Sequence, residues 1–183
     1  MNSIETILQA PEDVVVRSNR ELFGLSQAWF SLDDRYRYLL SRQWNEQGEL
    51  MNWLMLNPST ANEQVNDPTV ERCCRRAMHL GYGGVVVTNL FALRSTDPQA
   101  LYQADDPVGS DNLAVILQVA SLADRVVCAW GAHGERWPAH VTAVCDQLDQ
   151  MCIERWCLGV TMGGQPKHPL YVAMGQALIR FNS

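Results

Sequence analysis

The sequence contains very little lysine and few charges overall. Only Lys167 among its 14 basic residues is a lysine, and charged residues make up 19% of the 183 positions. The formal net charge of −6 counts against a purely electrostatic nucleic-acid binder. The hydrophobic content of 47% is too high for a disordered polar chain. The length suits one domain with its own core, so we expect a single domain over residues 1–183.

The sequence also lacks the cysteine spacing of a zinc or redox site. None of its six cysteines forms a C-x-x-C pair. Most of them lie in apolar stretches, so we interpret them as buried free thiols in a reducing compartment. We find no signal peptide and no apolar run of transmembrane length. These absences predict a cytoplasmic protein with no metal site, no other cofactor and no membrane partner.

Two stretches rich in β-forming residues surround an acidic turn in the first part of the chain. Residues 28–31 and 36–42 flank Asp33 and Asp34, which is the pattern of an antiparallel hairpin. Residues 1–25 are more polar. For them we expect either a looser N-terminal arm or an edge strand around 14–16.

The pattern after residue 49 alternates between apolar strands and amphipathic helices. Strands are predicted over 50–56, 85–90, 125–130 and 153–160 from their near-continuous apolar runs. Helices are predicted from Pro68 with Asp67 as N-cap, from about residue 113, from Pro138, and over 169–181. Four such β–α units predict an α/β three-layer sandwich. Its central sheet would be mostly parallel and four-stranded, with the antiparallel hairpin added at the N-terminal end.

Polar residues follow each predicted strand of the parallel sheet, where ligands bind in this class of fold. A single Asn-Pro-Ser segment is also ordinary turn chemistry, but four converging loops favour a site. The candidate substrate-binding residues are Pro58, Ser59, Thr60, Asn89, Arg94, Gly131, His133 and Lys167.

Positive charges are concentrated on one helix face and in the loops. Arg94 lies in a strand-end loop, where phosphate or carboxylate recognition is a reasonable role. The helix from Pro68 carries a basic stripe that could contact phosphates, formed by Arg72, Arg75, Arg76 and His79. We favour a solvated face with a Glu71–Arg75 ion pair for that stripe.

His168 is the most informative histidine of the sequence. It precedes Pro169 and follows a Gly-rich loop and the last predicted strand. An imidazole held stiffly there can hydrogen-bond a base edge or a developing anion. A helix-capping or surface histidine is the alternative. Common patterns such as the phosphate-binding P-loop, the nucleophile elbow and the zinc deaminase motif are absent.

Several short motifs resemble a bacterial and phage family of unknown function. They are LNPSTA at 56–61, DPT at 67–69, TNLFALR at 88–94, DP at 97–98, DPVG at 106–109, AWG at 129–131 and HPLY at 168–171. The resemblance extends from about Phe30 to the C-terminus and implies no established activity.

The order of these motifs also resembles, more distantly, the uracil-DNA glycosylase superfamily. Asn57-Pro58 is similar to the motif after the first core strand of those enzymes, and His168-Pro169 to the motif after the last. The resemblance implies a uracil-DNA glycosylase-like fold. It also implies that Asn57 positions or polarises an attacking water while His168 stabilises negative charge on the departing base.

The sequence therefore predicts an enzyme that acts on a nucleobase or nucleotide by N-glycosidic hydrolysis or a related step. The candidate catalytic residues are Asn57, His168 and Asp67, the last as an acid or base with helix capping as its alternative. The expected partner is a nucleotide, a modified nucleobase or single-stranded nucleic acid. Two rivals stay open, a non-catalytic nucleotide or nucleic-acid binding module and an interaction protein whose polar loops only satisfy the sheet ends.

Overall fold

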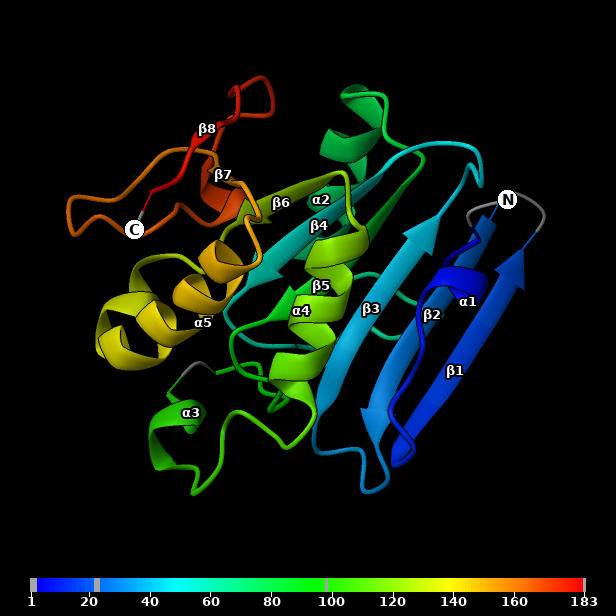
Figure 1. The fold of residues 1–183 in the computed structure, drawn as a ribbon, viewed down its shortest axis with the longest axis horizontal. Helices are drawn as coiled ribbons and strands as arrows, with labels where there is room; N and C mark the ends of the chain where they lie inside the picture. Colours follow the sequence, from blue (N-terminus) through cyan, green and yellow to red (C-terminus); the bar gives the residue numbers. More distant parts are fainter. Residues whose placement is uncertain (1–2, 22–23, 98, 183) are drawn as a thin grey trace.

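The computed structural model describes residues 3–21, 24–97 and 99–182, which form a mixed α/β fold around one sheet (Figure 1). The sheet has eight strands in the order β1-β2-β3-β5-β4-β6-β7-β8. In chain order they are β1 (Val14–Glu21), β2 (Gly24–Ser31), β3 (Arg37–Gln43), β4 (Leu50–Met55), β5 (Gly84–Asn89), β6 (Arg125–Cys128), β7 (Arg155–Cys157) and β8 (Ile179–Arg180).

The four strands predicted to be parallel form the middle of this sheet. Strands β5, β4, β6 and β7 pair in parallel, and the remaining strands join them antiparallel on both sides. The predicted hairpin is present as β2 and β3, and β3 pairs with β5. The hairpin therefore continues the central sheet, and the predicted count of four strands describes only its parallel part. Residues 14–21 form the edge strand β1, so that stretch is not a loose arm.

Helices cover both faces of the sheet. They are α1 (Ile4–Ile7), α2 (Pro68–His79), α3 (Ala100–Gln103), α4 (Asn112–Leu122) and α5 (Pro138–Gln150). Helix α2 lies behind the sheet in Figure 1, whereas α4 and α5 lie in front of it. Their buried residues belong to separate core clusters on the two faces. Pro98 of the DP motif lies outside the described residues, and α3 begins at Ala100.

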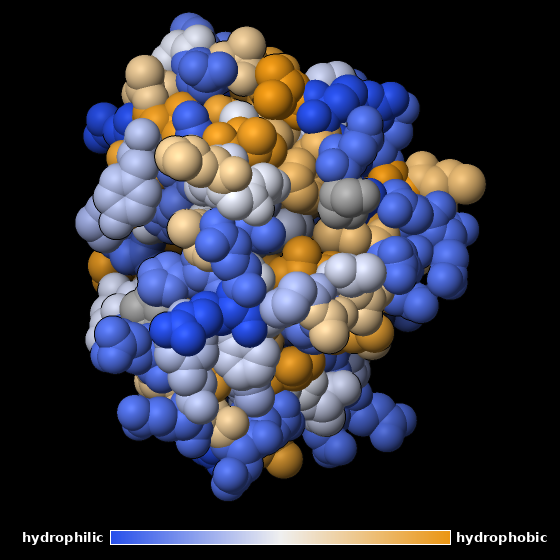
Figure 2. All heavy atoms as spheres, turned by 90° about the vertical axis from the view of Figure 1, so that its left-hand side faces the viewer, coloured by the Kyte–Doolittle hydropathy of each residue, from blue (hydrophilic) through white to orange (hydrophobic). Residues whose placement is uncertain are grey.

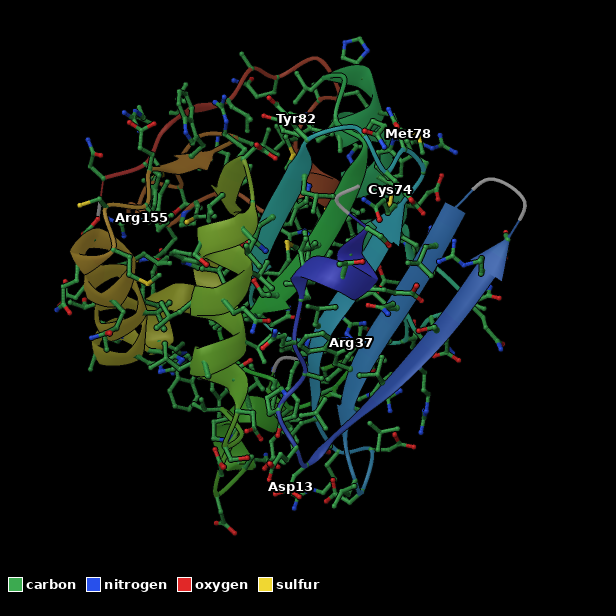
Figure 3. The ribbon with its side chains drawn as sticks, turned by 45° about the vertical axis from the view of Figure 1, so that its right-hand side comes forward. Asp13, Arg37, Cys74, Met78, Tyr82 and Arg155 are labelled. Carbon is green, nitrogen blue, oxygen red and sulfur yellow. The ribbon has the colours of Figure 1, made fainter. Side chains whose placement is uncertain are left out.

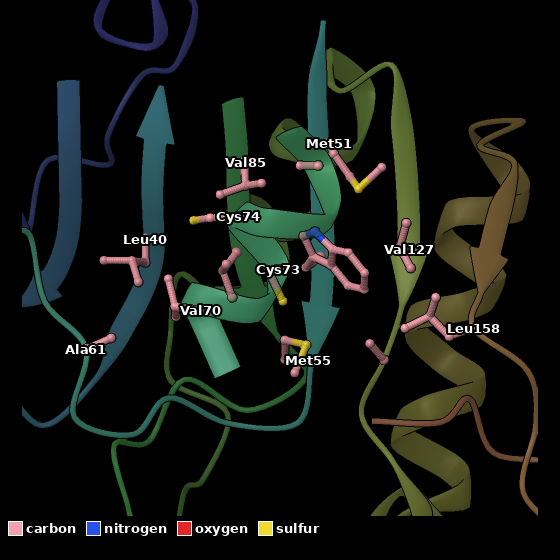
Figure 4. Close-up of a cluster of buried hydrophobic side chains, with 14 of the residues drawn as sticks. Leu40, Met51, Met55, Ala61, Val70, Cys73, Cys74, Val85, Val127 and Leu158 are labelled. Carbon is pink, nitrogen blue, oxygen red and sulfur yellow. The ribbon is translucent and has the colours of Figure 1, made fainter. Parts of the chain in front are cut away.

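Helix α2 forms where the sequence predicts it. One oxygen of the Asp67 carboxylate accepts the N–H groups of Thr69 and Val70, each at 2.9 Å, and Pro68 occupies the first turn. Figure 4 shows the buried face of the helix packed on the sheet, with Val70, Cys73 and Cys74. The spacing of the apolar residues also predicts Met78 on that face, but Met78 is 52% exposed because it lies in the last turn of the helix.

The helix predicted over 169–181 is wrong. The chain forms a 3-10 turn at Pro169–Tyr171 and then the short strand β8, which pairs antiparallel with β7. Two arginines of α2 donate hydrogen bonds to main-chain carbonyls that would accept from N–H groups of the same segment if it were a helix. Arg72 donates to the carbonyls of residues 169 and 172, and Arg76 donates to those of residues 172, 173, 174 and 176.

The basic stripe of α2 therefore divides into two parts. Arg75 makes the predicted ion pair with Glu71 at 2.8 Å and is exposed. Arg76 is only 3% exposed and Arg72 is half-buried, so neither belongs to a solvated face. Their guanidinium groups are occupied by main-chain carbonyls and hold residues 169–176 against the helix. This is a structural role, which the spacing of the residues could not distinguish from phosphate contact.

The cysteines and the helices give two further findings. None of the six cysteines forms a disulfide, and all except Cys152 are buried, as most of them were predicted to be. None of the described helices is long and apolar enough to cross a membrane.

The order of the parallel strands determines where a ligand can enter. Strand β4 lies between β5 and β6, and the helices that follow β4 and β6, α2 and α5, cover opposite faces. The connections at the carboxyl ends of β4 and β6 therefore diverge and leave a crevice between them. In open α/β sheets this switch point is the usual ligand position.

Candidate functional site

A cavity of about 580 Å³ lies at the carboxyl edge of the parallel strands. Its lining comes from the loops after β4, β5 and β6, from residues 161–171 and from the first turn of α2. Among the candidate residues from the sequence it includes Asn57, Ser59, Asp67, Asn89, Gly131, His133, Lys167 and His168. Four loops that are far apart in the chain thus meet around one space, as the strand order requires.

Three candidate residues do not line this cavity. Thr60 is exposed, and Pro58 is buried with its carbonyl accepting the amide of Asn57. Arg94 lies over the ring of Phe30, 5.0 Å from its centroid, and donates to the carbonyl of Asp34 at 3.0 Å. Arg94 is therefore bound to the hairpin rather than to the cavity, because the loop after β5 turns back along β3.

The amide of Asn57 has a fixed orientation. Its Nδ2 donates to the carbonyls of Pro58 at 3.0 Å and Ser95 at 2.9 Å, which uses both of its hydrogens. Its Oδ1 accepts no hydrogen bond from any described residue. Asn57 can therefore only accept a hydrogen bond from a water or ligand, so it can position a water but cannot polarise a group by donating to it.

His168 is held by the loop that follows β6. Gly131 has a φ of +75°, and a Cβ built there would lie 3.3 Å from the Cβ of His168. The backbone N–H of Gly131 donates to the carbonyl of Pro166 at 2.9 Å, and the Trp130 indole donates to the Gln165 side chain at 2.7 Å. A glycine is thus required at 131 by both its backbone and the close approach of the histidine.

The electrostatic surroundings keep the imidazole of His168 neutral. Burial lowers its pKa from 6.5; Asp67 opposes this shift and His133 adds to it. The Nδ1 atom accepts the N–H of Leu170 at 3.4 Å, so His168 also caps the 3-10 turn. In the neutral ring the proton then lies on Nε2, which makes that nitrogen a hydrogen-bond donor.

Asp67 and His133 also have partners within the protein. One oxygen of the Asp67 carboxylate caps α2, which was the alternative to an acid or base role. His133 is exposed, and its Nδ1 lies 3.1 Å from the hydroxyl of Tyr102. Lys167 forms no ion pair within the described part of the chain, and its side chain passes beside Gly159.

The structure adds lining residues that the sequence did not indicate, namely Arg37, Thr69, Ser95, Thr96, Trp130, Thr161 and Tyr171. Arg37 begins β3 and is buried, whereas Tyr171 is 86% exposed with its ring 5.5 Å from that of His168. Trp130 ends a predicted strand and belongs to the AWG motif at 129–131, which was a signal that could have identified it. No such signal existed for Arg37, which lies between two tyrosines in a strand pattern.

In the described ranges, no group of three or more His, Cys, Asp or Glu side chains is arranged to hold a metal ion. The family model described as protein of unknown function (DUF1643) matches residues 37–170 of this chain. A search of the curated proteins found no match. The family match includes Asn57, Asp67 and His168 and begins at Arg37.

Proposed function

The chain belongs to the DUF1643 family, and from the cavity we propose that it acts on a nucleobase or nucleotide, by N-glycosidic hydrolysis or a related base-processing step. One observation carries the proposal. An acceptor at Asn57 and a donor at His168, each held by its own loop, line the same cavity. The volume of about 580 Å³ is in the range of small-molecule sites.

The chemistry of such a cleavage matches these two groups. The sugar becomes cationic as the N-glycosidic bond breaks, and the departing base becomes negative. Asn57 Oδ1 would accept a hydrogen bond from the attacking water and hold it in place, while the proton that the water loses on attack passes to solvent. The Nε2–H of His168 would donate to the departing base and stabilise its charge.

The proposal includes a fold relationship to the uracil-DNA glycosylases. It is supported by the position of Asn57-Pro58 after β4, the first strand of the parallel set, and of His168-Pro169 after β7, the last. A cytoplasmic location is supported by the six cysteines, none of which forms a disulfide.

A non-catalytic nucleotide or nucleic-acid binding module is the second candidate. The arrangement of Asp67 favours it, because one oxygen of this carboxylate already accepts two N–H groups of α2. A hydrolase of this kind would then rely on positioning and hydrogen bonding without a dedicated base.

A panel of nucleosides, nucleotides and base-modified oligonucleotides tests the proposal. For a substrate that is cleaved, we expect Asn57→Ala and His168→Ala to lower kcat/KM by about 100-fold or more. His79→Ala is the control, since His79 is exposed on α2 away from the cavity lining. Equal activity of all variants would overturn the catalytic proposal. Saturable binding without turnover on any member of the panel would overturn it in favour of the binding module.

A further inference from the structure

Arg37 is a buried cation in the lining of the cavity. Its side chain is 2% exposed, at the start of β3, which runs antiparallel to β5. Nη1 donates to the carbonyl of Ala61 at 2.7 Å, while Nε is buried and has no partner among the described residues. Burial lowers the pKa of Arg37 to about 10, so it is still charged at neutral pH.

The charges around Arg37 do not neutralise it. Arg42 and Arg94 lie near enough to lower its pKa, and Asp67 is the acidic group that raises it. The ion pairs within the described chain do not include Arg37. A buried charge is costly unless an anion and hydrogen-bond acceptors meet it. The lining of the cavity therefore contains a buried cation that no ion pair neutralises, in a chain whose net charge is −6.

A second buried polar group in the lining is also left without a partner. Asn89 ends β5, the strand next to β3, and its side chain is 2% exposed. Its Oδ1 is buried with no hydrogen-bond donor among the described residues. Buried polar groups are nearly always paired in native proteins. Two neighbouring strands thus each supply to the lining of one cavity a residue with a buried, unpaired polar atom, a donor on Arg37 and an acceptor on Asn89.

We propose that this cavity binds its ligand through an oxyanion, the phosphate of a nucleoside monophosphate, which pairs with Arg37. A guanidinium matches phosphate geometry with two parallel hydrogen bonds. A donor on the same ligand then meets the Oδ1 of Asn89. This inference rests on the proposed function for the nucleoside part alone. The oxyanion site at Arg37 follows from the unpaired charge and would hold for any small phosphate monoester.

Binding to the wild-type protein tests the inference first. Calorimetry would compare a nucleoside, its 5′-monophosphate, ribose 5-phosphate and inorganic phosphate at constant ionic strength. We expect the monophosphate to bind about 10- to 100-fold tighter than the nucleoside. We also expect ribose 5-phosphate and phosphate to compete with it. A nucleoside that binds as tightly as its monophosphate would overturn the inference. If ribose 5-phosphate binds but the protein acts on no base, the result would support the oxyanion site at Arg37 and contradict the proposed function.

Substitution of the arginine supplies the second measurement. Arg37→Gln should abolish the preference for the monophosphate over the nucleoside, and Arg37→Lys should retain part of it. Arg35→Gln removes the same charge two residues away on the exposed surface and should leave the preference unchanged. Preserved discrimination in a folded Arg37→Gln protein would overturn the inference. If that variant does not fold, the wild-type series decides.

Discussion

Individual residues differ in how much of their role the sequence discloses. Asn57 could be predicted as a site residue because it directly follows a predicted strand, and His168 because it follows the Gly-rich loop after the last predicted strand. The orientation of the Asn57 amide could not, since its partner Ser95 lies 38 positions away. The role of Arg37 could not be predicted for a related reason. Its burial depends on the loop after β4, whose Ala61 carbonyl it binds.

The fixed amide of Asn57 gives a prediction for an isosteric substitution. Asn57→Asp places a carboxylate oxygen against the two carbonyl oxygens that accept hydrogen bonds from Nδ2 in the wild-type protein. We expect the free energy of unfolding to fall by about 2 kcal/mol, measured by urea denaturation at pH 7. Asn62→Asp is the matched control, because the Oδ1 of Asn62 accepts N–H groups and a carboxylate can replace it. Equal losses in the two variants would contradict this account.

The neutral imidazole of His168 gives a prediction for pH. Its pKa is lowered in the folded protein, so the unfolded chain binds a proton first as the pH falls below 6.5. Stability is therefore fully present above pH 6.5 and is lost as the pH falls through the lower, folded pKa. His168→Asn, which keeps a cap acceptor, should flatten this decrease in denaturation curves between about pH 7 and 5. His79→Asn, at an exposed position, should show the same decrease of stability with falling pH as the wild type. The same decrease in His168→Asn would show that His168 is not its cause.

At the scale of elements, prediction succeeded where local signals agree with packing. Helix α2 has its N-cap, its proline and its apolar face in sequence, and the structure retains all three. Residues 169–181 have an apolar pattern too, but their carbonyls bind two arginines about 100 positions earlier in the chain. A contact of that range leaves no local signature, so the segment was assigned to a helix and the arginines to the surface.

The two adjacent arginines of α2 allow a matched test of this element. Arg76→Met leaves the carbonyls of residues 173, 174 and 176 without their donor, and we expect a loss of about 3 kcal/mol in the free energy of unfolding. Arg75→Met removes an exposed ion pair and should cost less than about 0.5 kcal/mol. Limited proteolysis should cut residues 172–176 in the first variant only. Similar stability of the two variants would show that Arg76 does not hold this segment.

At the scale of the whole molecule, the structure gives partners to most of the positive charges that the sequence concentrates on one helix face and in the loops. Arg72 and Arg76 bind carbonyls, Arg75 binds Glu71, and Arg94 binds the hairpin. None of these four arginines lines the cavity. Its basic lining comes instead from Lys167, and from Arg37, which the sequence did not indicate. Hydrophilic side chains cover most of the face shown in Figure 2, with apolar ones in patches between them. Figure 3 shows Arg37 at the sheet, far from the labelled Arg155.

This distribution of charge predicts that the protein prefers small anions to long duplexes. A duplex binder neutralises many phosphates along one surface, and its affinity falls steeply with salt. Here the net charge is −6, and Arg72, Arg75, Arg76 and Arg94 all have partners within the protein. Fluorescence anisotropy with a labelled duplex at about 0.15 M salt should show a Kd weaker than about 0.1 mM. A nucleoside monophosphate should bind under the same conditions. Micromolar duplex binding with a steep salt dependence would instead demonstrate a surface that binds polyanions and would contradict the predicted preference for small anions.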